Sequence, residues 1–139
     1  AIARNLAVMS SLKTKILVLI SGEGGSGGAL ALGVGDHIAI LEYGTFSVAS
    51  PEACASIVWR ESEKAQEAAE AMKVGAHDLK KIGIVDEIII EPIGGAHQDY
   101  DMVSANIKSS LLINIAELSK FSLEELLQRR YQRLLKIGA

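Results

Sequence analysis

The chain has 139 residues and a formal net charge of −3, with 49% hydrophobic and 4% aromatic residues. This length suffices for one domain with its own core, and the net charge excludes a global basic field for nucleic acid or anionic membranes. No apolar run approaches the ~20 residues of a membrane span, and the single cysteine, Cys54, excludes an intrachain disulfide or a thiolate zinc cluster.

The first part of the chain alternates between apolar strands and short helices. We expect a helix over Ile2–Ser11, a strand over Ile16–Ile20, a helix over Gly27–Val34, strands over His37–Leu41 and Thr45–Val48, and a helix over Pro51–Trp59. Ser50 is a good N-cap for the last of these helices. The first residues carry neither an initiator Met nor a cap, which predicts that they lie within a helix of a longer protein.

The second part turns from α/β to helical. We expect helices over Glu61–Lys73 and His77–Ile82, the latter ended by Gly83, then a strand over Ile84–Ile90 and a loop over Ile93–Asp101. Two amphipathic helices follow, with apolar stripes formed by Val103, Ile107, Leu111, Ile115 and Leu118 and by Leu123, Leu126, Leu127, Leu134 and Leu135. Ser122 and Glu125 predict a capping box between them. The order predicts an α/β core over 1–101 and, over 102–139, a helical pair that packs on the core or on another subunit.

The most informative segment is the glycine-rich turn between the strand ending at Ile20 and the helix expected from Gly27. Amides at a helix start lack intrahelical partners and favour negative charge. Glycine at both Gly27 and Gly28 weakens a helix start unless a ligand must come close. We therefore favour an oxyanion site made by these two amides.

A nucleotide site is a weaker interpretation of the same turn. Gly22, Gly24 and Gly27 match G-x-G-x-x-G by count, and Glu42 lies about 20 residues further on, where dinucleotide-binding proteins place an acid. The turn lacks the Lys-Ser/Thr ending of a P-loop.

A serine hydrolase is the third interpretation. Ser26 stands at the centre of a G-x-S-x-G string, and Asp86 and His97 follow in a permitted triad order. The simpler role for Ser26 is that of a helix N-cap.

The remaining polar residues give weaker signals. His37, His77 and His97 lack metal-type spacing. Glu23 could orient the turn or act as an acid or base, and the simpler expectation is that it bonds loop amides. The last helix carries four cations, Arg129, Arg130, Arg133 and Lys136. They form either a solvated face that suits the helix dipole, or a docking patch for an acidic partner or CoA phosphates.

Four segments together resemble one family. GEGGSGGALALGVGD (Gly22–Asp36), SVASPEACASIVW (Ser47–Trp59), EIIIEPIGGAH (Glu87–His97) and RRYQRLLKIG (Arg129–Gly138) are similar to the C-terminal portion of the carboxyltransferase alpha subunit of bacterial-type, multisubunit acetyl-CoA carboxylase. The likeness runs nearly end to end, in the family's order and spacing.

The resemblance implies a crotonase-like (ClpP/crotonase) spiral of ββα units with appended C-terminal helices. It also implies transfer of a carboxyl group from carboxybiotin on a biotin carboxyl carrier protein to acetyl-CoA, giving malonyl-CoA for fatty-acid biosynthesis. The implied partners are a carboxyltransferase beta subunit in an α2β2 heterotetramer and, in the larger complex, biotin carboxylase. The implied location is the bacterial cytoplasm or the plastid stroma. No metal and no covalently held biotin are expected in this chain.

By motif position, the family's oxyanion amides correspond to Gly27 and Gly28. Gly24, Gly25 and Ser26 correspond to the part of the turn on the carboxybiotin side. Besides the hydrolase, a noncatalytic assembly module that holds partners through the C-terminal helices stays open as an alternative.

Overall fold

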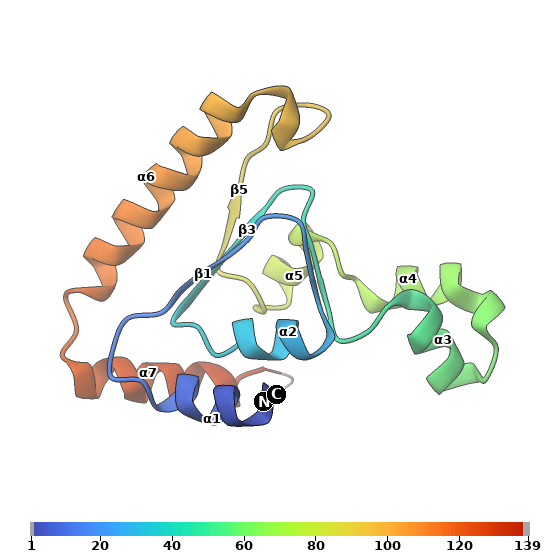
Figure 1. The fold of residues 1–139 in the computed structure, drawn as a ribbon, viewed down its shortest axis with the longest axis horizontal. Helices are drawn as coiled ribbons and strands as arrows, with labels where there is room; N and C mark the ends of the chain where they lie inside the picture. Colours follow the sequence, from blue (N-terminus) through green and yellow to red (C-terminus); the bar gives the residue numbers. More distant parts are fainter. Residues whose placement is uncertain (1, 138–139) are drawn as a thin grey trace.

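The structure is a computed structural model that describes residues 2–137 (Figure 1). Residues 1, 138 and 139, including the last glycine of the RRYQRLLKIG segment, lie outside the described residues. The strands are β1 (Leu17–Ile20), β2 (Glu23–Gly25), β3 (His37–Leu41), β4 (Thr45–Ser47) and β5 (Glu87–Ile89). The α-helices are α1 (Ile2–Ser11), α2 (Ser26–Leu32), α3 (Pro51–Trp59), α4 (Ala65–Met72), α5 (Ala76–Lys81), α6 (Tyr100–Leu118) and α7 (Leu123–Leu135). Two 3-10 turns, η1 (Ser62–Lys64) and η2 (Ala96–Gln98), complete the elements of the described chain.

Most expected elements are confirmed, two differ, and one strand was not expected. The helix expected over Glu61–Lys73 is divided into η1 and α4. The strand expected from Ile84 begins only at Glu87, because the amides of Ile84 and Val85 bond back to the Leu79 carbonyl and close the end of α5. The glycine turn holds a strand, β2, that has no apolar pattern by which the sequence could have predicted it.

The strands form two parallel stacks. The order in the larger sheet is β1-β3-β5, with Leu17 opposite His37 and Ala39 opposite Glu87. The smaller stack pairs β2 with β4, Gly24 opposite Phe46. Each β1-β2-α2 and β3-β4-α3 segment is therefore one ββα unit stacked on the next, although no repeat is visible in the sequence.

The larger sheet is covered on both faces, which explains the continuous apolar run of β3. Ile38 and Ile40 point to a core formed with Leu79 and Val85, on the side of α2 and α5. The alternate residues Ala39 and Leu41 point to a second cluster that contains Val103 of α6.

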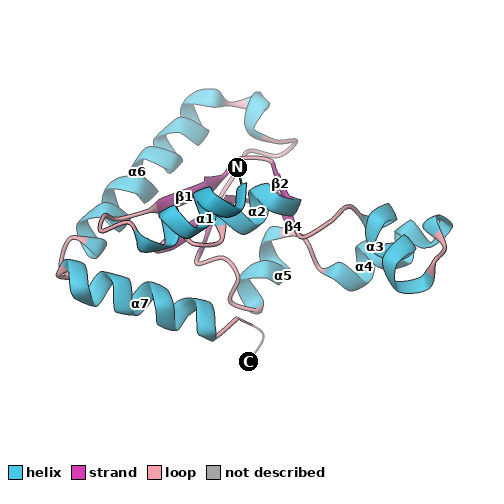
Figure 2. Ribbon diagram, turned by 60° about the horizontal axis from the view of Figure 1, so that its bottom comes forward, coloured by secondary structure: helices cyan, strands magenta, loops and turns pink. Residues whose placement is uncertain are grey.

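A helical arm formed by α3, η1 and α4 projects from one end of the molecule (Figures 1 and 2). Its start follows the expected chemistry, because Ser50 accepts a hydrogen bond from the Ala53 amide at 3.2 Å and Pro51 opens the helix. The three arm elements contact one another more than they contact the sheet.

The two C-terminal helices lie along different sides of the molecule rather than against each other (Figure 1). The capping box of Ser122 and Glu125 is confirmed. The expected apolar stripe of α6 holds at Val103 and Leu118 but not at Ile115, which is 46% exposed. That of α7 holds at Leu126 but not at Leu123 and Leu135, which are 51% and 55% exposed. The expected domain boundary falls after the first two residues of α6, and the division itself stays a prediction. Within residues 2–137, no helix combines the length and apolarity that crossing a membrane requires.

Candidate functional site

The candidate site is built on the turn that joins β1 to α2. Ser21 and Gly22 bend the chain out of the larger sheet, and β2 then pairs with β4. The Gly22 carbonyl accepts a 2.8 Å hydrogen bond from the Thr45 amide, which fixes the bend against the next ββα unit. Helix α2 starts directly after β2, so its first turn lies at the end of the small parallel stack.

Gly24 is a packing glycine. It is buried, and a Cβ at this position would lie 2.8 Å from Cδ2 of Phe46, its partner across the small stack. Gly25 has extended backbone angles and is the N-cap of α2. The ring of Phe46 therefore accounts for the glycine at Gly24, while the role of Gly24 and Gly25 beside a substrate stays a prediction.

Ser26 makes the sharp change from strand to helix. Its φ is 51°, in the left-handed region that costs an ordinary residue of order 1–3 kcal/mol. The expectation that Ser26 is the N-cap is wrong: the cap is Gly25, which has no side chain to accept a hydrogen bond. A capping hydroxyl needs an extended backbone at its own residue, and Ser26 does not have one.

Gly27 and Gly28 follow within the first turn of α2, where amides have no intrahelical acceptor. Among residues 2–137, neither amide donates to a side chain or to a carbonyl outside the helix. Gly28 is exposed, and no atom of the described residues lies within 4 Å of the position that a Cβ would occupy. Packing inside this chain therefore does not explain the glycine at Gly28, unlike that at Gly24.

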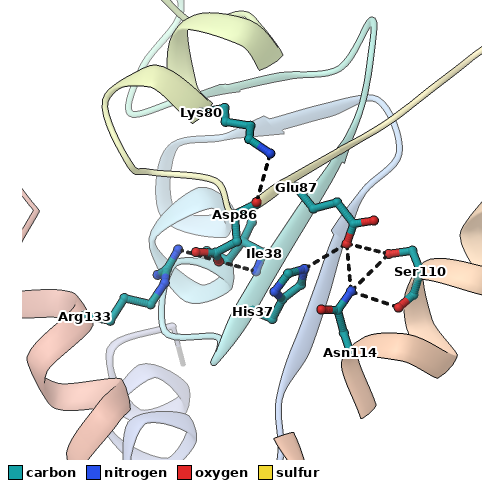
Figure 3. Close-up of polar contacts among 8 residues, drawn as sticks. All are labelled: His37, Ile38, Lys80, Asp86, Glu87, Ser110, Asn114 and Arg133. Atoms are coloured by element: carbon teal, nitrogen blue, oxygen red, sulfur yellow. Dashed lines mark hydrogen bonds and ion pairs between the residues drawn. The ribbon is translucent and has the colours of Figure 1, made fainter. Parts of the chain in front are cut away.

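The structure does not assemble the hydrolase triad. The Asp86 carboxylate accepts from the Ile38 amide at 2.8 Å and pairs with Arg133 at 3.1 Å (Figure 3). The His97 ring contacts the Gln98 side chain. Within the described chain, Ser26 has no hydrogen bond to a histidine, so the strained turn alone resembles a nucleophile elbow.

The dinucleotide interpretation also lacks its structural context. That fingerprint requires a strand that leads straight into a helix, whereas β1 leads into β2. The Glu42 carboxylate accepts from the Glu91 amide at 3.2 Å instead of facing a ribose site.

Glu91 is a polar residue that the sequence analysis missed. It is 8% exposed, and its two oxygens accept 2.8 Å hydrogen bonds from the amides of Tyr43 and Ala96. Together with Glu42 it ties the loop after β3 to the loop after β5. A glutamate directly after an apolar strand and before Pro92 was the available signal, but its acceptor role depends on amides distant in sequence.

A second polar cluster joins the sheet to α6 (Figure 3). One oxygen of Glu87 accepts from Ser110 at 2.8 Å and from Asn114 at 2.7 Å, and lies 3.1 Å from Nε2 of His37. Burial pushes the pKa of the Glu87 carboxyl upward, but hydrogen bonds from Ser110, His37 and Asn114 outweigh burial and leave the pKa below its ordinary value of 4.5. The sequence predicted no partner for His37.

The other ionisable residues of the sequence analysis are dispersed. His77 lies 4.0 Å from Glu42, and Glu23 is exposed in β2. Residues 2–137 contain no group of three or more histidine, cysteine or acidic side chains placed to hold a metal ion.

The four cations in and just after α7 do not form one solvated face, which corrects the expectation of a solvated cationic face. Arg130 is 2% exposed and binds Asp36 through two 2.8 Å contacts. Arg133 is half-buried and bonds to the Ile84 carbonyl and to Asp86. Arg129 is exposed and lies over the Phe121 ring, 4.1 Å from its centre, and Lys136 is exposed.

Comparison with known proteins gives a consistent result. A family model described as acetyl co-enzyme A carboxylase carboxyltransferase-like matches residues 1–138. The chain is 53% identical over 138 residues to the acetyl-coenzyme A carboxylase carboxyl transferase subunit alpha of Pseudoalteromonas atlantica, and 55% identical to those of Vibrio cholerae and Photorhabdus laumondii. Each match covers 99% of this chain and 43% of the relative, so the chain spans less than half the length of these relatives.

A solved structure shares the fold at low sequence identity. It is a chain in the crystal structure of a Pseudomonas malonate decarboxylase hetero-tetramer in complex with coenzyme A. The TM-score is 0.62 at 14% identity, over 93% of this chain and 51% of the other. The expected crotonase-like α/β fold of stacked ββα units is confirmed.

Proposed function

The chain belongs to the acetyl-CoA carboxylase carboxyltransferase-like family, and from this premise we propose that it forms the part of an alpha subunit that faces carboxybiotin. The proposed reaction moves a carboxyl group from carboxybiotin on a carrier protein to acetyl-CoA and gives malonyl-CoA. The observation that carries the proposal is the pair of glycine amides at the start of α2, which in residues 2–137 have no acceptor outside the helix.

The residues present fit an anionic acceptor. Carboxybiotin supplies the carboxyl group, and its release leaves negative charge on the oxygen of the biotin urea. The amides of Gly27 and Gly28 would donate to that oxygen, in line with the helix axis, where the dipole favours negative charge. The open space at Gly28 leaves room for a ring to approach the backbone closely.

Fixed main-chain donors suit this step, because they do not have to reorganise as the charge develops. Loss of one oxyanion donor typically raises a reaction barrier by about 2.7–4 kcal/mol. Ser26, strained at φ 51°, would set the direction of these amides as the chain leaves β2. Gly24 and Gly25 would form the wall of the turn on the same side.

The partners follow from the same premise. The relatives are named as alpha subunits, and the structural neighbour belongs to a hetero-tetramer. We propose that this chain works with a carboxyltransferase beta subunit in an α2β2 assembly, together with a biotin carboxyl carrier protein and biotin carboxylase. The bacterial relatives favour the bacterial cytoplasm as the location.

The test is a pair of substitutions at Gly28 in the full-length alpha subunit, assembled with its partners. Gly28→Pro removes the N–H, and at the third helical residue this N–H has no intrahelical bond to lose. Gly28→Ala keeps the N–H and adds a methyl group into open space. Gly28→Pro should lower malonyl-CoA formation at least ~100-fold, with the assembly intact by size-exclusion chromatography. Full activity of Gly28→Pro within an intact assembly would refute the oxyanion role, whereas loss of activity in both variants would indicate close approach of the substrate.

A further inference from the structure

A cavity of about 460 Å³ lies beside α7. Its walls come from the end of α5, the segment before β5, the end of α6 and one side of α7. Arg133 lines it and reaches the Gly33 carbonyl at the C-cap of α2 at 3.5 Å. The described lining residues include none from the glycine turn or from α2, so this cavity is separate from the proposed oxyanion site.

The cavity is lined by more cations than carboxylates. Its charged lining residues are Arg129, Arg130, Arg133, Lys136, Asp36 and Asp86. Arg130 pairs with Asp36 and Arg133 pairs with Asp86, so both carboxylates are already used. Within residues 2–137, Arg129 and Lys136 have no ion pair. Two unmatched positive charges thus line one concave site of a chain whose net charge is −3, and a concave site focuses their field on an anion.

Helix-dipole stabilisation accounts for Lys136, the C-cap of α7, but not for Arg129. Cations help a helix C-terminus only within its last turn, and Arg129 stands six positions before Leu135, the last residue of α7. Contact with the Phe121 ring restrains the Arg129 guanidinium beside the cavity. Among the residues that the structure describes, the Nε–H of Arg133 is buried without a partner, so the guanidinium has one donor still uncommitted.

The size and the remaining walls indicate the class of ligand. The volume lies in the range of about 300–1,000 Å³ that holds small organic ligands, and it is far larger than a bare oxyanion. Ile82, Leu118 and Ile137 give apolar walls beside the cations. We propose that this cavity binds a small organic phosphate monoester: Arg129 and Lys136 hold the phosphate, and the organic body lies on the apolar walls.

The proposal is tested by calorimetric binding to the full-length protein, with no turnover involved, so its failure is distinct from failure of the proposed carboxyl transfer. The probe is adenosine 3′,5′-bisphosphate, and unphosphorylated adenosine is the reference. Arg129→Gln and Lys136→Gln, both at exposed positions, should each weaken bisphosphate binding about tenfold, since hydrogen bonds to charged groups contribute about that much. Lys108→Gln, which changes an exposed cation of α6 outside the cavity, should leave it unchanged.

Competition identifies the source of the phosphate. Displacement of the bisphosphate by coenzyme A would show that the cavity receives a phosphate of a CoA substrate, and lack of displacement would show a site for a free organic phosphate. Either result supports the cavity as a phosphate site. The proposal is overturned if the bisphosphate binds no more tightly than adenosine, or if the two cavity variants bind it as the unchanged protein does.

Discussion

The guanidinium of Arg130 and the carboxylate of Asp36 form a bidentate ion pair between residues 94 positions apart, with both side chains 2% exposed. Nη1 and Nη2 of Arg130 also donate to carbonyl groups between the end of α1 and the start of β1, the shortest being 2.7 Å to Thr14. Asp36 in turn accepts from the Ile16 amide at 2.7 Å. One side chain of α7 thereby fastens the chain entering β1 to the chain entering β3.

Arg130→Ala should strongly destabilise the fold. It leaves Asp36 buried without its counter-charge and the carbonyls of residues 12 and 14 without their donor, and breaking a buried pair costs about 3–5 kcal/mol. Chemical unfolding of the full chain measures the loss. Gln128→Ala, at an exposed position of the same helix, is the control and should cost less than ~0.5 kcal/mol.

A double-mutant cycle separates the ion pair from the carbonyl contacts of Arg130. Adding Asp36→Asn to Arg130→Ala should cost much less than Asp36→Asn does alone, because the two residues interact directly. Strictly additive costs would show that the pair contributes nothing as a pair.

The Arg130–Asp36 pair also shows where sequence reasoning ends. The apolar stripe of α7 correctly placed Leu126 inside, where it is 1% exposed. Arg130 lies four positions after Leu126 on the same face of the helix, so it is buried together with the apolar stripe. Nothing local identifies a partner 94 residues away, and cations in a C-terminal helix are ordinarily solvated. The hydrogen bonds of Glu91 were missed for the same reason.

The elements that flank the glycine turn could be predicted from the sequence, but the strand within it could not. Strand β1 and helix α2 follow from apolar patterning and glycine punctuation, and the first turn of α2 lies where the sequence indicated. Strand β2 was not predictable, since its residues Glu23, Gly24 and Gly25 have neither apolar alternation nor high β-propensity. Pairing with β4 forms this strand, and that pairing is a tertiary interaction.

Gly24 and Gly28 should therefore respond in opposite ways to alanine. Gly24→Ala places a methyl group 2.8 Å from the Phe46 ring and should cost about 1–3 kcal/mol through overpacking. Gly28→Ala adds a methyl group in open space within a helix and should stabilise the chain by about 0.4–1 kcal/mol. Urea unfolding of both variants gives the comparison, and equal destabilisation would contradict this assignment of roles.

Glu87 makes stability depend on pH in a specific window. Because its pKa is lowered in the folded chain from the ordinary 4.5, the ionised carboxylate stabilises the fold fully only above that pH. The contribution is lost as the pH falls through the lowered value. The unfolding free energies of the unchanged chain and of Glu87→Gln should therefore differ most near neutral pH and converge in acid.

Ser110→Ala supplies the companion measurement. It removes a 2.8 Å donor to the Glu87 carboxylate, so the pH-dependent part of the stability should become smaller although Glu87 is still present. The contradicting result is a constant difference between the free energies of unfolding of the unchanged chain and of Glu87→Gln from neutral pH into acid. It would show that this cluster does not stabilise the ionised carboxylate.

The backbone of Ser26 leads to a prediction about strain. At φ 51°, glycine is unstrained, serine is disfavoured, and a β-branched residue is a genuine outlier. Ser26→Gly should leave the free energy of unfolding equal or higher, whereas Ser26→Val should lower it by of order 1–3 kcal/mol. Ser26 is exposed, so these differences would not come from burial.

Ser104 is the matched control, since it is exposed in the interior of α6, where the backbone is helical. There the order should reverse: Ser104→Gly should cost about 0.5–1 kcal/mol, and Ser104→Val should change little. Thermal unfolding of the four variants compares the two sites directly. If valine is tolerated at Ser26 as well as at Ser104, the turn that aims the glycine amides is not held in the left-handed conformation, and the direction assigned to those amides loses its basis.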